Sequence, residues 1–180
     1  MMMINRRTVC AAPIALALEA QASTRAGTDN YGGFSIDMSR SASSTREQSL
    51  ASLRSQIDLV NSLRIKPEIS AWFRQTRLVI DPSIRGPGEF RNGRLALKGG
   101  QTPPDDPLLL HELLHGWHFQ KTPGRRRNPE ILAFYAQARA SGAFPAQSYM
   151  LSNVVEFYVM TASTVLWGRA ARPPRTRDRV

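Results

Sequence analysis

The chain of 180 residues is long enough to bury one hydrophobic core and short for two domains. Its hydrophobic fraction of 42% and mean hydropathy of −0.32 argue against a polytopic membrane protein. The net charge of +10 comes almost wholly from arginine, but basic residues do not interleave with aromatic ones. We therefore expect the arginines to be solvated and expect no nucleic-acid partner. A basic nucleic-acid binder is the less favoured alternative.

Residues 1–26 have the layout of an export signal. Arg6 and Arg7 precede an apolar run of about a dozen residues, and small residues lead to a plausible cleavage point after Ala22. The paired arginines resemble a twin-arginine signal, so we expect a periplasmic or secreted protein without stable membrane insertion. Because Cys10 is the only cysteine, no intramolecular disulfide can form.

The domain itself is expected to cover residues 27–168. Its polar beginning, to about Ser44, is interpreted as a linker or a loose arm. Apolar residues at spacings of three and four then predict a helix over residues 45–66, followed by a short helix over residues 68–73. The β-branched run at residues 77–80 predicts a strand.

A turn-rich connection over residues 83–93 follows, and Asn92-Gly93 within it is a strong tight-turn signal. The alternation over residues 94–98 predicts a strand exposed on one face. As an edge strand beside the next helix, it would pair with an extended peptide. In the following loop, Asp105 or Asp106 is expected to cap that next helix, with Pro107 in the first turn.

Two further helices complete the domain. The segment Asn128-Pro129-Glu130 looks like a helix start, and Ile131, Phe134, Tyr135 and Ala138 are expected to form its buried face. The last helix is expected to begin at Ser148 or Asn153 and to end at Trp167, where Gly168 closes it. Residues 169–180 are interpreted as a disordered tail rich in arginine and proline.

The most informative stretch is Leu108 to Phe119, LLLHELLHGWHF, which contains the pattern H-E-x-x-H. On a helix, His111 and His115 lie on one face, so their imidazoles can share one metal ion, usually zinc. Glu112 can then hold the water on the metal as a general base without being a ligand. The residues around these three are uncharged, as expected for a buried metal helix.

A catalytic zinc site normally takes three protein ligands. Glu156 is the preferred third ligand because it is the only charged residue in NVVEFYVMTASTVLW, where an unpaired carboxylate would be costly to bury. His118, one turn after His115, is the main alternative, although a role at the rim of the site is favoured for it. Glu130 is a more distant alternative for the third ligand.

A tyrosine is a candidate for stabilising the oxyanion. Tyr149 precedes Glu156 by two helical turns, if the helix extends that far, so its phenol could reach the reacting oxygen. An anchoring role in the core is equally compatible with the pattern. Tyr135 and Tyr158 are the alternative candidates for stabilising the oxyanion.

These motifs, HELLH at residues 111–115 and NVVEF at residues 153–157, resemble the zincin metallopeptidases of the gluzincin type. The segment EFYVMTAS is similar to the glutamate helix of the anthrax lethal factor-like peptidases. In those proteins a tyrosine precedes the glutamate by about two turns, which supports Tyr149. The resemblance covers about Leu108 to Trp167, and Val159 departs from it where relatives often carry a small residue.

The resemblance implies an α+β, zincin-like fold, in which a small mixed sheet packs on the HExxH helix and a C-terminal glutamate helix. It also implies a zinc-dependent endopeptidase. We therefore predict one Zn²⁺ per chain bound by His111, His115 and Glu156, with a peptide or protein as substrate and a monomeric state. The alternative is a non-catalytic zinc-binding or interaction protein on the same fold.

Overall fold

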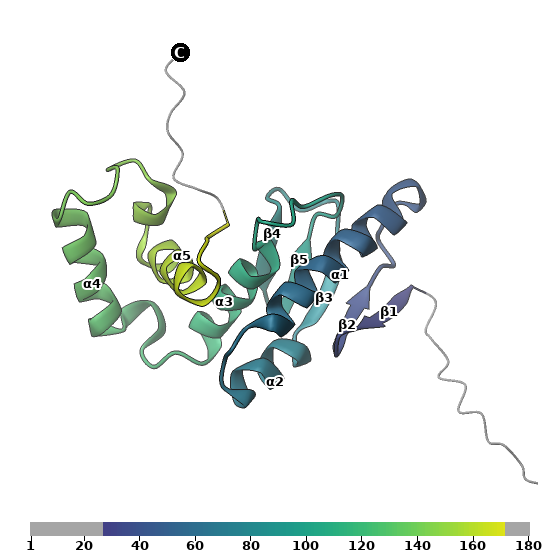
Figure 1. The fold of residues 1–180 in the computed structure, drawn as a ribbon, viewed down its shortest axis with the longest axis horizontal. Coiled ribbons are helices and arrows are strands. Elements are labelled where there is room, and N and C mark those ends of the chain that lie inside the picture. The colour runs from purple at the N-terminus through teal and green to yellow at the C-terminus, as the bar shows by residue number, and fades with distance from the viewer. Residues whose placement is uncertain (1–26, 172–180) are drawn as a thin grey trace, which may run out of the picture.

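The structure, a computed structural model, describes residues 27–171 and has a mixed α+β architecture (Figure 1). Within this range the chain forms a small mixed sheet and five α-helices. The strands are β1 (Thr28–Tyr31), β2 (Phe34–Asp37), β3 (Arg77–Ile80), β4 (Gly88–Arg91) and β5 (Arg94–Leu97). The helices are α1 (Arg46–Ser62), α2 (Pro67–Gln75), α3 (Leu108–Gln120), α4 (Pro129–Ala140) and α5 (Val154–Trp167), with short 3-10 turns at Ser43–Thr45, Arg125–Arg127 and Tyr149–Leu151.

The sheet has the strand order β1-β2-β3-β5-β4. Its three central strands β2, β3 and β5 run parallel, and the outer strands β1 and β4 pair antiparallel with their neighbours. The predicted strands at residues 77–80 and 94–98 are thus confirmed as β3 and β5. The predicted tight turn at Asn92-Gly93 joins β4 to β5, and both residues have positive φ angles of 53° and 75°.

The expected N-terminal linker is wrong, because residues 28–37 form the hairpin β1–β2 at one edge of the sheet. Phe34, Ile36 and Met38 alternate along this segment and are buried at 1%, 0% and 0% exposure. Their period of two is the strand signal that the surrounding polar residues obscured. At the end of β2, hydrogen bonds from Ser39, aided by Arg77 of β3, hold the pKa of Asp37 at about 2.

The expectation that residues 94–98 form an edge strand also needs correction. The strand β5 is not an edge strand, since it lies between β3 and β4, and its Leu95, Ala96 and Leu97 are all buried. The edge is β4, which arises inside the segment expected to be a connection only. Consequently β4, not β5, is the strand with unpaired backbone groups beside α3.

One hydrophobic core joins the sheet to α1 and α3. Phe34, Leu78 and Leu95 of the sheet pack with Ile57 of α1 and Leu109 of α3, each at most 1% exposed. Helix α3 runs through the middle of the molecule, between the sheet and α5 (Figure 1). In the described part of the chain, every helix is too short or too polar to cross a bilayer.

The start of α3 is held in part by another helix. Pro107 occupies the position before the helix, and no side chain from there caps it. Instead, the buried Gln56 of α1 accepts a hydrogen bond from Leu109 N–H at 3.2 Å and donates one to the Asp106 carbonyl at 2.8 Å. Asp105 pairs instead with Arg169 at 2.6 Å, so the expected capping role of Asp105 is wrong.

The C-terminal helices match their predicted positions but not all of their predicted surroundings. Helix α5 begins after Asn153, whose side chain accepts from the N–H groups of Val155 and Glu156, and Gly168 closes it with a φ of 79°. Helix α4 buries none of its residues fully, but Ile131, Tyr135 and Ala138 of its predicted buried face are half-buried, whereas Phe134 is 62% exposed and was predicted wrongly. The export segment 1–26 and tail residues 172–180 lie outside the described residues, whereas Ala171 is fully buried.

Candidate metal centre

Helices α3 and α5 bring His111, His115 and Glu156 together. The two histidines lie one turn apart on α3, and Glu156 lies in the first turn of α5, which packs against α3. One ligand atom from each residue lies within 4.8 Å of the others. The three residues predicted as ligands are therefore a group that could hold a metal ion.

The spacing of the three donors fits a small tetrahedral ion. The Nε2 atoms of His111 and His115 are 3.1 Å apart, Oε2 of Glu156 lies 3.3 Å from His111 Nε2, and Oε1 of Glu156 lies 3.5 Å from His115 Nε2. Ligands about 2.1 Å from a tetrahedral zinc ion are separated from one another by about 3.4 Å. The donor set of two imidazoles and one carboxylate is also a set that zinc accepts.

The charge of Glu156 is stabilised by its surroundings. Burial raises the pKa of this carboxyl, but a hydrogen bond with His111, the charges of His115 and His111, and a hydrogen bond from Tyr149 outweigh that effect. The net result is a pKa below the usual value, so Glu156 is a carboxylate at neutral pH. An ionised carboxylate facing two imidazoles is the form that a metal requires.

Glu112 lies beneath the edge strand β4. Its side chain is 3% exposed and contacts the backbone of Gly88 so closely that a Cβ at Gly88 would lie 2.7 Å from Glu112 Cγ. Only glycine leaves room for this carboxylate between α3 and β4. One turn further along α3, Gly116 similarly faces Phe90, whose ring would be 2.5 Å from an added Cβ.

A cavity of about 500 Å³ lies against Glu112, His115 and Glu156. Gly88, Glu89 and Phe90 of β4 form one wall, and residues 153–155 of α5 and its cap contribute to another. The Phe119 ring stacks on His115 at 6.0 Å between centroids, and the Arg126 guanidinium lies 4.9 Å from the centre of that ring. The cavity thus runs along an edge strand and past two residues of the candidate metal group, His115 and Glu156.

Tyr149 is the tyrosine that the structure brings into this cavity. It lies on the 3-10 turn Tyr149–Leu151, not on α5, because the last helix begins at the later of its two predicted starts, Asn153. Its hydroxyl still reaches Glu156 by hydrogen bonding. The alternatives are engaged elsewhere: Tyr135 donates to the Leu151 carbonyl at 2.8 Å, and Tyr158 packs edge-on against His118 at 4.3 Å.

His118 is not part of the ligand group. Its side chain is fully buried against Tyr158, and burial, opposed by a hydrogen bond with the Arg125 backbone, lowers its pKa. These surroundings describe a neutral histidine in the interior of the α3–α5 interface. Glu130, the more distant alternative, is exposed in the first turn of α4.

Sequence reasoning missed several residues that shape the site. Gly88 and Phe119 are the clearest examples, because their roles depend on β4 crossing α3 and on the stacking of one aromatic ring on His115. Gln56 is another, since it fixes the start of α3 from a distance of more than fifty residues in sequence. No local pattern around these positions indicates such contacts.

Comparison of the chain with models of protein families, with curated proteins and with solved structures finds no match in any of the three.

Proposed function

We propose that this protein is a zinc-dependent metallopeptidase with a zincin-like fold. The observation that carries the proposal is the set of donor separations of 3.1, 3.3 and 3.5 Å among His111, His115 and Glu156, with Glu112 next to them in the same cavity. An HExxH helix, a glutamate from a later helix and an edge strand beside them are the parts that peptide hydrolysis requires.

The edge strand β4 is suited to hold the substrate. Among residues 27–171, no strand pairs with its outer side, and Gly88 to Phe90 line the cavity. An extended peptide would add to β4 by backbone hydrogen bonds, which would lay its scissile carbonyl across Glu112 and the metal ligands. Backbone pairing of this kind accepts many sequences, so side-chain preference would come from the walls of the cavity.

The proposed reaction uses Glu112 as the proton carrier. Zinc held by His111, His115 and Glu156 would supply Lewis acidity to the carbonyl and would lower the pKa of a water molecule. Glu112 would take a proton from the attacking water and pass it to the nitrogen of the leaving amine, so that water and peptide become an acid and an amine. Tyr149 would donate a hydrogen bond to the oxygen on which negative charge develops.

The test is digestion of a diverse peptide library by the zinc-loaded protein, read by mass spectrometry. Glu112→Gln should bind zinc like the parent and lower turnover by about a thousandfold, because general acid–base catalysis contributes on this scale. Glu130→Gln makes the same chemical change on α4 and should leave turnover intact. Equal cleavage by Glu112→Gln would remove the general-base role, and zinc binding without any cleavage would favour a non-catalytic zinc protein.

A further inference from the structure

Helix α4 is apolar around its whole circumference and yet buries no residue. Its sequence PEILAFYAQARA carries only two charged side chains, Glu130 and Arg139. Leu132 and Phe134, which are about 200° apart around the helix, are 41% and 62% exposed. A helix that is apolar on all sides is normally covered by protein or by lipid. Something other than water is therefore expected around α4.

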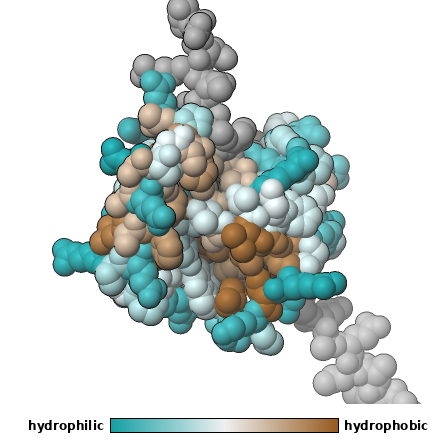
Figure 2. All heavy atoms as spheres, turned by 60° about the vertical axis from the view of Figure 1, so that its left-hand side comes forward, coloured by the Kyte–Doolittle hydropathy of each residue, from teal (hydrophilic) through white to brown (hydrophobic). Residues whose placement is uncertain are grey.

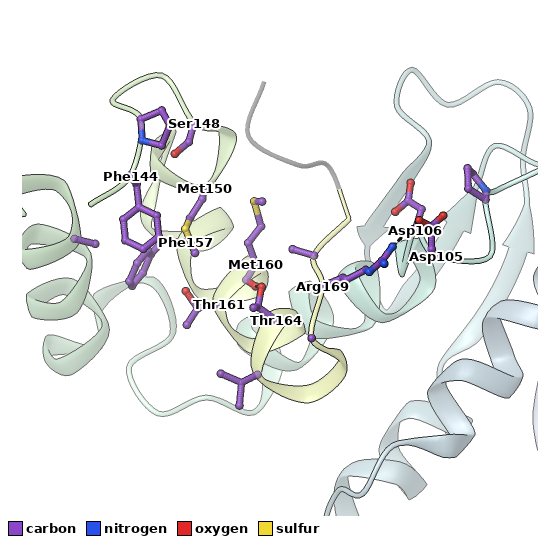
Figure 3. A pocket seen from close by; sticks show the side chains of 16 residues that line it. Asp105, Asp106, Phe144, Ser148, Met150, Phe157, Met160, Thr161, Thr164 and Arg169 are labelled. Carbon is purple, nitrogen blue, oxygen red and sulfur yellow. Dashed lines mark hydrogen bonds and ion pairs between the residues drawn. The ribbon is translucent and has the colours of Figure 1, made fainter. Parts of the chain in front are cut away.

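The exposed surface continues onto α5 and the loop before it. Val165 of α5 is 79% exposed, and Phe144 of the loop is 39% exposed. Hollows of about 700 and 860 Å³ lie on either side of α5 and share Val165, Phe157 and Thr161 in their linings. Figure 2 shows hydrophobic residues gathered on this side of the molecule, and Figure 3 shows Phe144, Phe157 and Thr161 around the larger hollow. We call this surface, formed by α4, α5 and residues 141–151, the apolar face.

Basic residues border most of the apolar face, while Asp105 and Asp106 line the larger hollow, where Asp105 is paired with Arg169. Lys121 and the exposed run Arg125–Arg127 precede α4, and Arg139 lies in its last turn. Arg64 and Lys66 flank Ile65, which lines the smaller hollow. In sequence, the segment after Ala171 adds four arginines and one aspartate, and it follows Gly168 to Ala170, which line the larger hollow. An apolar surface with a basic border complements negatively charged headgroups above hydrocarbon.

We propose that the apolar face docks on an anionic lipid bilayer, with α4 lying in the plane of the headgroups. The 12 residues of α4 span about 18 Å, too short to cross about 30 Å of hydrocarbon, so the binding is peripheral. A second copy of the chain is disfavoured as the occupant, because a symmetric contact would bring two arginine borders together. The proposal concerns a surface outside the metal centre and does not rest on the proposed function.

Vesicle sedimentation with the full chain tests the proposal. At about 0.1 M salt, binding to vesicles of phosphatidylcholine with about 30% phosphatidylglycerol should exceed binding to pure phosphatidylcholine at least about tenfold. The double variant Phe134→Asp, Val165→Asp should lose at least about tenfold in partition coefficient, since it adds charge to the part that enters the lipid. Ala71→Asp, at an exposed position of α2, should change it less than about twofold.

The two aspartates replace exposed side chains, so unchanged thermal melting should accompany the loss of binding. If the double variant binds vesicles as the parent does, another part of the chain attracts the lipid and the proposal fails. It also fails if the parent ignores anionic vesicles and sedimentation velocity shows a dimer that the double variant dissociates.

Discussion

Helices α3 and α4 are neighbours in the chain, have similar lengths and are both rich in apolar residues, but they lie in opposite surroundings. Helix α3 buries nine of its thirteen residues, including His111, Glu112 and His118, whereas α4 buries none of its twelve. The difference lies in what packs on each helix: α3 contacts the sheet, α1 and α5, while α4 contacts mainly α5 and two short turns. Apolar composition therefore accompanies a helix in both cases, but the helix is buried in only one of them.

The comparison also explains where chemistry can be placed. A histidine or carboxylate inside α3 is removed from water and held by neighbours on several sides, so its geometry is fixed. Side chains of α4 have neighbours mainly on the side that faces α5, as Tyr135 does, and the other sides are exposed among the described residues. The candidate metal centre accordingly uses α3 and the α5 side that faces α3, whereas the opposite side of α5 shares the apolar face with α4.

The largest expected effect separates the glutamates of α5 and α4. Glu156→Gln removes the one carboxylate of the ligand group, and zinc affinity should fall by at least about a hundredfold, since even outer partners of metal ligands contribute up to this much. Glu130→Gln removes an exposed carboxylate from the first turn of α4 and should leave affinity unchanged. Competition with a chromophoric chelator measures both constants. Equal affinities in the two variants would mean that zinc does not use Glu156.

The second largest expected effect concerns how tightly β4 packs on α3. In Gly116→Val the new side chain would meet the Phe90 ring, which is 2.5 Å from the position of an added Cβ, so β4 must move. Overpacking of this kind should lower the free energy of unfolding by about 2–3 kcal/mol. Ala136→Val places the same side chain on an exposed position of α4 and should cost only a few tenths of a kcal/mol. Urea denaturation compares the two; equal losses would show that β4 does not press on α3.

Much of this architecture could be predicted from the sequence because its signals are local. The period of the apolar residues located α1, the HExxH stretch located α3, the end signal at Gly168 located α5, and the β-branched run located β3. The pair His111 and His115 depends only on helical spacing, and Glu156 on being a lone charge among apolar residues. These signals do not depend on how distant segments of the chain pack.

What the sequence could not provide depends on contacts between distant segments. The hairpin β1–β2 was hidden because three alternating apolar residues lie among polar ones, and their burial requires β3 beside them. The identity of the edge strand depends on β4 joining the sheet outside β5. Within α4, Ile131, Tyr135 and Ala138 are half-buried as their spacing predicts, but Phe134 is exposed because no further layer of the described chain covers it.

A third effect compares how the two helices begin. Helix α3 depends on Gln56 of α1, so Gln56→Leu leaves Leu109 N–H and the Asp106 carbonyl without this partner and should cost about 2 kcal/mol of unfolding free energy. Helix α4 is capped by its own Asn128, which accepts from Ile131 N–H at 3.0 Å. Asn128→Ala should cost about 1 kcal/mol. Thermal and urea unfolding of both variants check the order, and a larger loss at Asn128 would contradict it.

The smallest expected effect is at Leu132 on α4. Leu132 is 41% exposed, so Leu132→Ala removes few contacts, and alanine favours the helix at least as well as leucine does. The free energy of unfolding should change by less than about 0.5 kcal/mol. The same substitution at the fully buried Leu110 of α3 should cost about 3 kcal/mol, because it leaves a cavity in the core. A loss above about 2 kcal/mol at Leu132 would show that α4 is already covered in solution, and the contrast between the two helices would then disappear.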